Sequence, residues 1–334
     1  MNEQIRTGQA RLGAIRSIFG LVLLVMVTSG CVANPVPAVP APGSGQPTTA
    51  HTQESNALEA ASTITAAVTA TADLPATDSQ TPPPQAEAEA DWLSMPIVPT
   101  VSPRMKDVFE RGQKSGRDAA RFSKIGDCQN ITTYFLAMYD SGNYRLGDQY
   151  AYLQPTIDHF KGSWWRQSLS VKGGMNVAAV LSPIWANPDK CLPKETPLAC
   201  ELRVYNPAFA VISLEESWSG SIEHYDMYLR EIVEYVLAQD IVPILATRAE
   251  TETQERQINP TVARIAHDYQ VPLWNFGAAA RALPNNGIRP DGFHITEGQS
   301  YFDDEAMLKT GWTQRNLTAL QAIDAVYRGL TQEP

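Results

Sequence analysis

Two short motifs, far apart in the chain, carry residue types that can do acyl-transfer chemistry together. Residues 126–128 read Gly-Asp-Cys, and the run that follows predicts a helix over 130–139. Cys128 would then lie at a helix start, where the N-terminus favours the nucleophilic thiolate. Residues 291–294 read Asp-Gly-Phe-His. A carboxylate held against one imidazole nitrogen fixes the tautomer and leaves the other nitrogen as a base.

The elements that must position these motifs alternate between apolar strand-like runs and amphipathic helices. This alternation predicts βαβ units and a mostly parallel sheet covered on both faces. Ligands of such sheets bind beyond the carboxyl ends of the strands, where both motifs would lie. The expected strands are 121–126, 208–214, 241–246 and 271–276, and the expected helices are 130–139, 221–240, 260–269 and 313–330.

The two motifs, in this order and on this framework, resemble the blocks of the SGNH or GDSL hydrolase family. The resemblance covers most of 121–300 and implies a flavodoxin-like, three-layer α/β/α sandwich that hydrolyses esters. In that family a serine attacks the ester carbonyl. By resemblance, Cys128 takes the place of that serine, His294 is the general base and Asp291 orients it.

The same resemblance identifies candidate donors to the oxyanion that forms during ester hydrolysis. A glycine block at 173–176 implies a backbone N–H from Gly173 or Gly174, and we favour Gly174; a tight turn would equally explain both glycines. Where the family has Gly-x-Asn-Asp, residues 214–218 read Leu-Glu-Glu-Ser-Trp, so Ser217 is the nearest replacement for the asparagine. Loss of such a donor costs about 10²–10³ in rate.

The changed nucleophile and the missing asparagine keep a second function open, a catalytically degenerate binding or scaffold protein. A glycosidase pair at 215–216 is disfavoured, because adjacent residues on a strand point to opposite faces. The histidines at 224, 267 and 294 lack metal-ligand spacing, and there is no glycine-rich nucleotide motif. We therefore expect no metal and no cofactor.

The first hundred residues predict a leader and a tether rather than a folded domain. Residues 1–30 have a basic start, a short apolar run at 18–27 and small residues before Cys31, as in a bacterial lipoprotein signal. A lipid on Cys31 would anchor the protein extracytoplasmically to a bacterial membrane. Residues 31–100, rich in Pro, Ala and Thr, should remain disordered, which leaves 101–334 as the hydrolase-like domain.

The net charge and the side-chain types indicate which classes of molecule the protein can bind. The net charge of −10 argues against nucleic acid. Cys191 and Cys200 bracket a proline-containing loop that suits a disulfide in an oxidising compartment. Four tryptophans near the inferred site suit the binding of sugar rings, namely Trp164, Trp165, Trp185 and Trp218. The expected substrate is therefore a small-molecule or glycan ester, and a lipid ester is the alternative.

Overall fold

The computed structural model describes residues 92–214, 220–251 and 257–332. The chain divides into two units, Met1–Pro75 and Ala76–Pro334, and every described residue lies in the second. The predicted leader, the lipidation site at Cys31 and the candidate donor Ser217 lie outside the described residues. Within the described residues, no helix combines the length and the apolarity that crossing a membrane requires.

A parallel sheet forms the middle layer of the domain. Its strands are β1 (Asp118–Gly126), β2 (Pro207–Ser213), β3 (Val242–Ala246) and β4 (Leu273–Trp274), in the order β1-β2-β3-β4. Every neighbouring pair is parallel, so each connection must cross over the sheet, and helices make these crossings. Beyond β1, Val171 pairs with Gly126 through an isolated parallel bridge.

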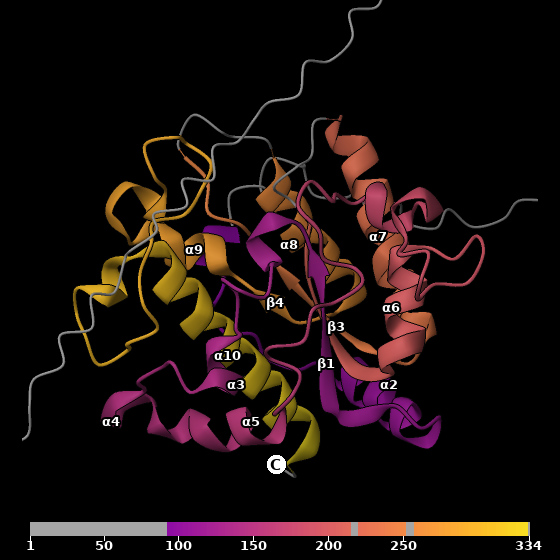
Figure 1. The fold of residues 1–334 in the computed structure, drawn as a ribbon, viewed down its shortest axis with the longest axis horizontal. Helices are drawn as coiled ribbons and strands as arrows, with labels where there is room; N and C mark the ends of the chain where they lie inside the picture. The colour runs from indigo at the N-terminus through magenta and orange to yellow at the C-terminus, as the bar shows by residue number, and fades with distance from the viewer. Residues whose placement is uncertain (1–91, 215–219, 252–256, 333–334) are drawn as a thin grey trace, which may run out of the picture. The chain divides into compact units, whose positions relative to one another are not determined.

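Helices cover the sheet on both sides, which makes the domain a three-layer α/β/α sandwich and confirms the predicted fold class. Figure 1 shows α3, α5 and α10 on one side and α6 and α7 on the other. The α-helices are α2 (Pro103–Lys114), α3 (Met138–Ser141), α4 (Gly147–Tyr150), α5 (Gln154–His159), α6 (Pro197–Tyr205), α7 (Ile222–Ala238), α8 (Ile258–Tyr269), α9 (Phe276–Arg281) and α10 (Gly311–Thr331). Short 3₁₀ turns are η1 (Trp92–Ser94), η2 (Cys128–Asn130), η3 (Ala151–Leu153), η4 (Ala179–Leu181), η5 (Pro183–Trp185), η6 (Pro284–Gly287) and η7 (Met307–Lys309).

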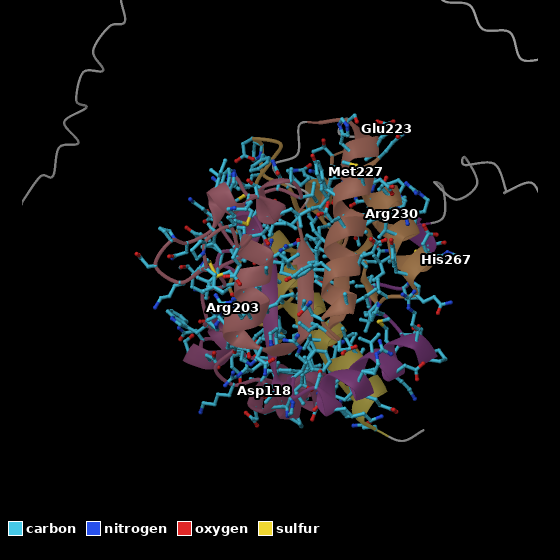
Figure 2. All side chains as sticks on the ribbon, turned by 90° about the vertical axis from the view of Figure 1, so that its right-hand side faces the viewer. Asp118, Arg203, Glu223, Met227, Arg230 and His267 are labelled. Carbon is cyan, nitrogen blue, oxygen red and sulfur yellow. A yellow bond between two sulfur atoms is a disulfide. The ribbon has the colours of Figure 1, made fainter. Side chains whose placement is uncertain are left out.

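The four expected strands and the helices expected at 221–240, 260–269 and 313–330 are confirmed, with β4 shorter than expected. The periodicity of α7 explains why its prediction succeeds. Leu229, Ile232 and Val236 are buried, whereas Glu223 and Met227 lie on the outer side of the helix (Figure 2).

The helix expected over 130–139 is wrong. The chain instead forms η2, a series of turns and the four-residue α3. Leu136 has a φ of 68°, which no right-handed helix allows, and its N–H donates to Asn316 Oδ1 at 2.9 Å. A bond to a distant side chain therefore replaces a helical one. Cys128 begins a three-residue 3₁₀ turn, so the structure offers no long helix whose N-terminus would activate the thiol.

Residues 92–100, which composition assigns to the tether, pack on the domain. Trp92 is buried, and Asn275 Nδ2 donates to Trp92 O at 2.7 Å and to Met95 O at 3.1 Å. The Asn275 N–H donates to Ile97 O at 3.1 Å. This segment therefore satisfies a buried amide at the end of β4.

The predicted disulfide between Cys191 and Cys200 is present, with a Cα–Cα distance of 5.2 Å. It joins the loop before α6 to the helix itself. The Cys128 thiol takes no part in a disulfide, so it keeps the chemical form that a nucleophile requires.

Adjacent tryptophans give a matched test of the core. Trp164 is fully buried, contacts Phe122 at a ring-centroid distance of 4.8 Å and donates from Nε1 to Ile157 O at 2.9 Å, whereas Trp165 is 58% exposed. Trp164→Ala should lower the free energy of unfolding in urea by about 3–5 kcal/mol, because it leaves a large cavity and an unpaired carbonyl. Trp165→Ala should change it by less than about 0.5 kcal/mol. Equal effects of the two variants would contradict this placement of the core.

Candidate functional site

The turn that carries Cys128 is fixed at the carboxyl end of β1. Asp127 caps η2, since its Oδ1 accepts from the Gln129 N–H at 3.2 Å. The Asn130 N–H donates to Asp127 O at 3.0 Å, and the Ile131 N–H donates to Cys128 O at 3.3 Å. Asp127 is completely buried, so it serves as a structural cap beneath the thiol and is not exposed to substrate.

Gly126 is required by a close approach of side chain to backbone. A Cβ on this residue would lie 2.0 Å from Asn130 Nδ2, a distance that no real contact tolerates. The same Nδ2 donates to Ser213 O at 2.9 Å, which ties the turn to the end of β2. Arg315 Nη2 from α10 donates to Ser213 Oγ at 2.8 Å. The nucleophile turn is therefore held by two strand ends and by a helix from the far end of the chain.

The Asp291–His294 pair forms as expected. His294 Nδ1 lies 3.1 Å from Asp291 Oδ2, while Asp291 Oδ1 accepts the N–H groups of Phe293 and His294, each at 2.9 Å. These two backbone bonds first, and then the imidazole, lower the pKa of Asp291 to about 2. The carboxylate is therefore ionised throughout the neutral range and can accept a proton-bearing Nδ1, which leaves Nε2 as the basic nitrogen.

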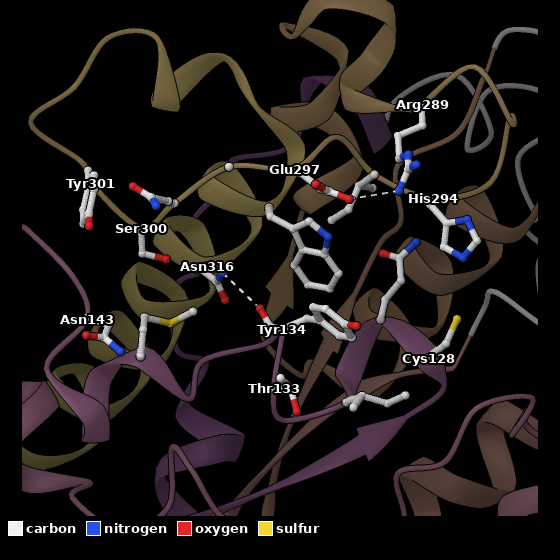
Figure 3. Close-up of a pocket in the computed structure, with 17 residues that line it drawn as sticks. Cys128, Thr133, Tyr134, Asn143, Arg289, His294, Glu297, Ser300, Tyr301 and Asn316 are labelled. Atoms are coloured by element: carbon white, nitrogen blue, oxygen red, sulfur yellow. Dashed lines mark hydrogen bonds and ion pairs between the residues drawn. The ribbon is translucent and has the colours of Figure 1, made fainter. Parts of the chain in front are cut away.

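Cys128 and His294 line one cavity of about 720 Å³. Figure 3 shows the Cys128 side chain pointing from the turn toward the side of the cavity where the His294 imidazole lies. Both side chains reach solvent, since Cys128 is half-buried and His294 is 58% exposed. The arrangement brings a thiol, an oriented imidazole and space for a substrate to the same end of the sheet.

The glycine block lies beside the nucleophile turn but does not line this cavity. The Lys172 N–H donates to Gly126 O at 3.4 Å and the Gly126 N–H to Ser170 O at 3.0 Å, so the chain reaches Gly173 and Gly174 directly after pairing with β1. Gly174 has a φ of +79°, which explains a glycine there by conformation alone. Its role as an oxyanion donor stays a prediction, as does that of Ser217, which lies outside the described residues together with Glu215 and Glu216.

The aromatic side chains of the cavity are not those expected from the sequence. Trp164 lies in the core, and neither Trp165 nor Trp185 lines the cavity; Trp218 lies outside the described residues. Tyr134, Tyr301 and Trp312 line it instead. The rings of Tyr134 and Trp312 stack with centroids 5.8 Å apart and an interplanar angle of 28°. Sequence reasoning missed Tyr134, because it falls inside a helix that does not form.

The three histidines considered as metal ligands lie on different elements, His224 on α7, His267 on α8 and His294 in the loop after η6. Within the described ranges, the group of ligand-type atoms close enough to share an ion is Cys191, Glu195 and Cys200. The two cysteines of this group form the disulfide and offer no thiolate.

Asp291→Asn should test the orienting carboxylate. The amide can still accept a backbone N–H, but its NH₂ group would face Nδ1 and favour the tautomer with the proton on Nε2. If the chain hydrolyses esters, we expect kcat/KM to fall on the order of 10²- to 10⁴-fold. Asp303→Asn, in an exposed ion pair with Arg145, is the matched control and should stay within about threefold.

The lowered pKa of Asp291 also fixes how the contribution of this residue to the stability of the fold changes with pH. Its folded value of about 2 lies below the ordinary 3.8, so its bonds stabilise the fold above about pH 3.8 and lose this contribution as the pH falls through 2. The stability difference between the parent protein and Asp291→Asn should therefore narrow between pH 4 and pH 2. A constant difference would contradict the assigned bonds.

Comparison with known proteins finds similar chains among solved structures. No family model matches it, and no curated protein matches it. Among solved structures, it is similar to the psychrotrophic esterase EstA from Pseudoalteromonas sp., with 14% identity over 62% of this chain and 96% of that chain and a TM-score of 0.38. It is also similar to a GDSL-like lipase from Bacteroides thetaiotaomicron, with 14% identity over 66% and 97% of the two chains and a TM-score of 0.34. A two-domain esterase active on acetylated mannans shares 15% identity over 69% of this chain and 54% of that chain, with a TM-score of 0.38.

Proposed function

We propose that this protein is an extracytoplasmic hydrolase of esters or acyl groups in which Cys128 is the nucleophile. The observation that supports the proposal is the cavity shared by Cys128 and an aspartate-oriented His294. A thiol, an imidazole base and a carboxylate that orients the base are the groups that acyl transfer by a cysteine uses.

The reaction follows from the chemistry of the three groups. His294 Nε2 takes the proton of the Cys128 thiol, and the sulfur attacks the ester carbonyl. The tetrahedral intermediate collapses as the alcohol leaves with the proton from His294, and a thioester remains on Cys128. Water then gives its proton to His294 and attacks the thioester, which releases the carboxylic acid and restores the thiol. Asp291 holds the imidazole in one tautomer throughout and stabilises its protonated form.

Steady-state hydrolysis of 4-nitrophenyl butyrate by the purified full chain tests the proposal. Multiple turnovers per protein molecule are required, because a single burst would report only acylation of a thiol. If the protein shows no turnover but binds glycans, the alternative function, a catalytically degenerate binding protein, would be correct. The decisive variants are those of Cys128.

The membrane anchor is a separate part of the proposal and rests on the sequence around Cys31. Cys31→Ala should shift the protein from the membrane fraction to the soluble extracytoplasmic fraction and abolish labelling by a radioactive fatty acid. Cys128→Ala is the matched cysteine control and should stay in the membrane fraction. Fatty-acid labelling that persists in Cys31→Ala would overturn the anchor.

A further inference from the structure

We propose that the cavity binds a neutral sugar ring against Tyr134, so that the substrate is an acylated carbohydrate. This inference rests on the proposed function for the chemical step, whereas the binding of the sugar can be tested without turnover.

Tyr134 is 58% exposed, yet the backbone around it is held firmly. Its N–H donates to Ile131 O at 3.0 Å, and its carbonyl accepts from Asn316 Nδ2 at 3.3 Å (Figure 3). Two residues later, the Leu136 N–H donates to Asn316 Oδ1 at 2.9 Å. Asn316 is itself buried, so one side chain of α10 fixes the chain on both sides of the tyrosine.

The ring of Tyr134 is also fixed. It stacks on Trp312, which lies one helical turn before Asn316 on α10. One face of the phenol ring is thus turned to Trp312, which leaves the other face and the edge for a ligand. A rigid aromatic face that is open to a cavity loses little entropy when it binds a flat apolar surface, which is why tyrosine is common in binding sites.

The other cavity residues favour a neutral, hydroxylated ligand. Neutral hydrogen-bonding side chains predominate among the polar groups, and the charged Arg289 and Glu297 pair with each other at 3.1 Å (Figure 3). Gln129 lines the cavity at 3% exposure, and its Oε1 finds no partner in the described part of the chain. A buried amide oxygen of this kind is an acceptor that a ligand hydroxyl can satisfy.

A pyranose ring has both an apolar face and hydroxyl groups, which match the aromatic and the neutral polar side chains of the cavity. Its C–H face is apolar and slightly positive, which suits the negative face of an aromatic ring, and its hydroxyls suit amides and hydroxyls. A long acyl chain would need a mostly aliphatic lining. Only three of the lining side chains are aliphatic, Ile131, Met138 and Ile295, so the cavity is poorly suited to such a chain. The sugar is therefore the alcohol part of the ester, on the Tyr134 side of Cys128 and His294.

The test compares esters that share an acetyl group and differ in the alcohol. The substrates are ethyl acetate and the methyl 6-O-acetyl glycosides of glucose, galactose and mannose. At least one glycoside should exceed ethyl acetate by tenfold or more in kcat/KM. Tyr134→Ala should lower that value 10- to 100-fold more than it lowers kcat/KM for ethyl acetate, whereas Tyr134→Phe should stay within about threefold because it keeps the ring. Tyr152→Ala removes a 48% exposed tyrosine outside the cavity and is the matched control.

The outcomes separate the inference from the proposed function. Turnover of ethyl acetate, with no preference for any of the three glycosides and no effect of Tyr134→Ala, would overturn the sugar site and leave the hydrolase intact. If no ester is turned over, calorimetry on Cys128→Ala with the same glycosides decides the binding alone. Tyr134-dependent binding there would keep the sugar site without the hydrolase, and its absence would overturn the site.

Discussion

Replacing Cys128 with alanine should lower steady-state hydrolysis of 4-nitrophenyl butyrate on the order of 10³-fold or more. The reason is that the thiol is the atom that bonds to the acyl group, and the cavity offers His294 no other nucleophile of equal strength in the same place. Alanine removes only the sulfur, at a half-buried position outside the hydrophobic core. The midpoint of urea unfolding should therefore change little, which separates loss of chemistry from loss of fold.

His294→Asn supplies the matching loss of the base and should be about as severe, because nucleophile and base act as one unit. The double variant Cys128→Ala/His294→Asn should then be no worse than either single variant, since groups that act in the same step are strongly non-additive. Activity of Cys128→Ala equal to that of the parent protein would end the proposed role of this cysteine. Additive losses in the double variant would place the two residues in different steps.

Cys128→Ser distinguishes a working cysteine from a site that has lost its chemistry. Sulfur is larger than oxygen, and a site that has adapted to it should lose activity when the smaller, less acidic hydroxyl replaces it. We expect a fall of at least tenfold. A serine variant that is active where the parent protein is inert would instead identify a degenerate site, and the scaffold alternative would then be correct.

The sheet was predictable because each strand shows a recognisable apolar pattern in its own sequence. Residues 208–212 and 241–246 are apolar throughout and buried throughout, as parallel strands covered on both faces must be. The Asp291–His294 pair was predictable for a similar reason, since both partners lie within three residues of each other. In each case the physical cause lies inside the segment that shows the pattern.

Two helices outside the predicted set, α2 and α6, have clear start signals in the sequence. Ser102 before Pro103 caps α2, with Ser102 Oγ accepting the Met105 N–H at 3.3 Å, and Thr196 caps α6 before Pro197 in the same way. A Ser or Thr followed by Pro is a recognisable helix start. These two helices were therefore within reach of sequence reasoning.

The walls of the cavity were out of reach, because they depend on contacts across the whole domain. Nothing near Tyr134 indicates that its segment will be held by Asn316, which follows it by 182 residues. The same contact explains the failed helix, since Asn316 supplies a partner for the Leu136 N–H that a helix would have supplied internally. Tertiary hydrogen bonds thus overrode a local preference at the site itself.

The second large effect concerns the pH dependence of stability and is expected at Lys124 on β1, two residues before the nucleophile turn. This side chain is 2% exposed, and its Nζ donates to Thr132 Oγ1 at 2.9 Å and to Trp164 O at 3.0 Å. Burial first, and then the nearby Arg166 cation, lower the pKa of Lys124 to about 7, against the opposing effect of Glu201 and Asp140. The folded protein thus binds fewer protons at Lys124 than the unfolded chain between pH 7 and 10.5.

Linkage then gives the sign of the effect. Because the unfolded chain binds more protons in this interval, stability rises with pH, by up to about 1.4 kcal/mol per pH unit. Lys124→Met removes the titrating group. The free energy of unfolding of the parent protein minus that of Lys124→Met should therefore increase by several kcal/mol from pH 7 to pH 10, and should be flat below pH 7, where the lysine is charged in both states. Urea unfolding at matched pH values measures this difference.

Other groups titrate in the same range, but they are shared by the two proteins and cancel in the difference. Lys106→Met on the exposed side of α2 is the matched control, and its difference from the parent protein should stay within about 0.5 kcal/mol at every pH. Parallel stability curves for Lys124→Met and the parent protein would contradict a buried lysine that loses its proton near pH 7. A rising difference has a consequence for the site as well, because Thr132, which accepts from Lys124, belongs to the segment between Cys128 and Tyr134. The strand that ends at the nucleophile would then also secure the wall of its cavity.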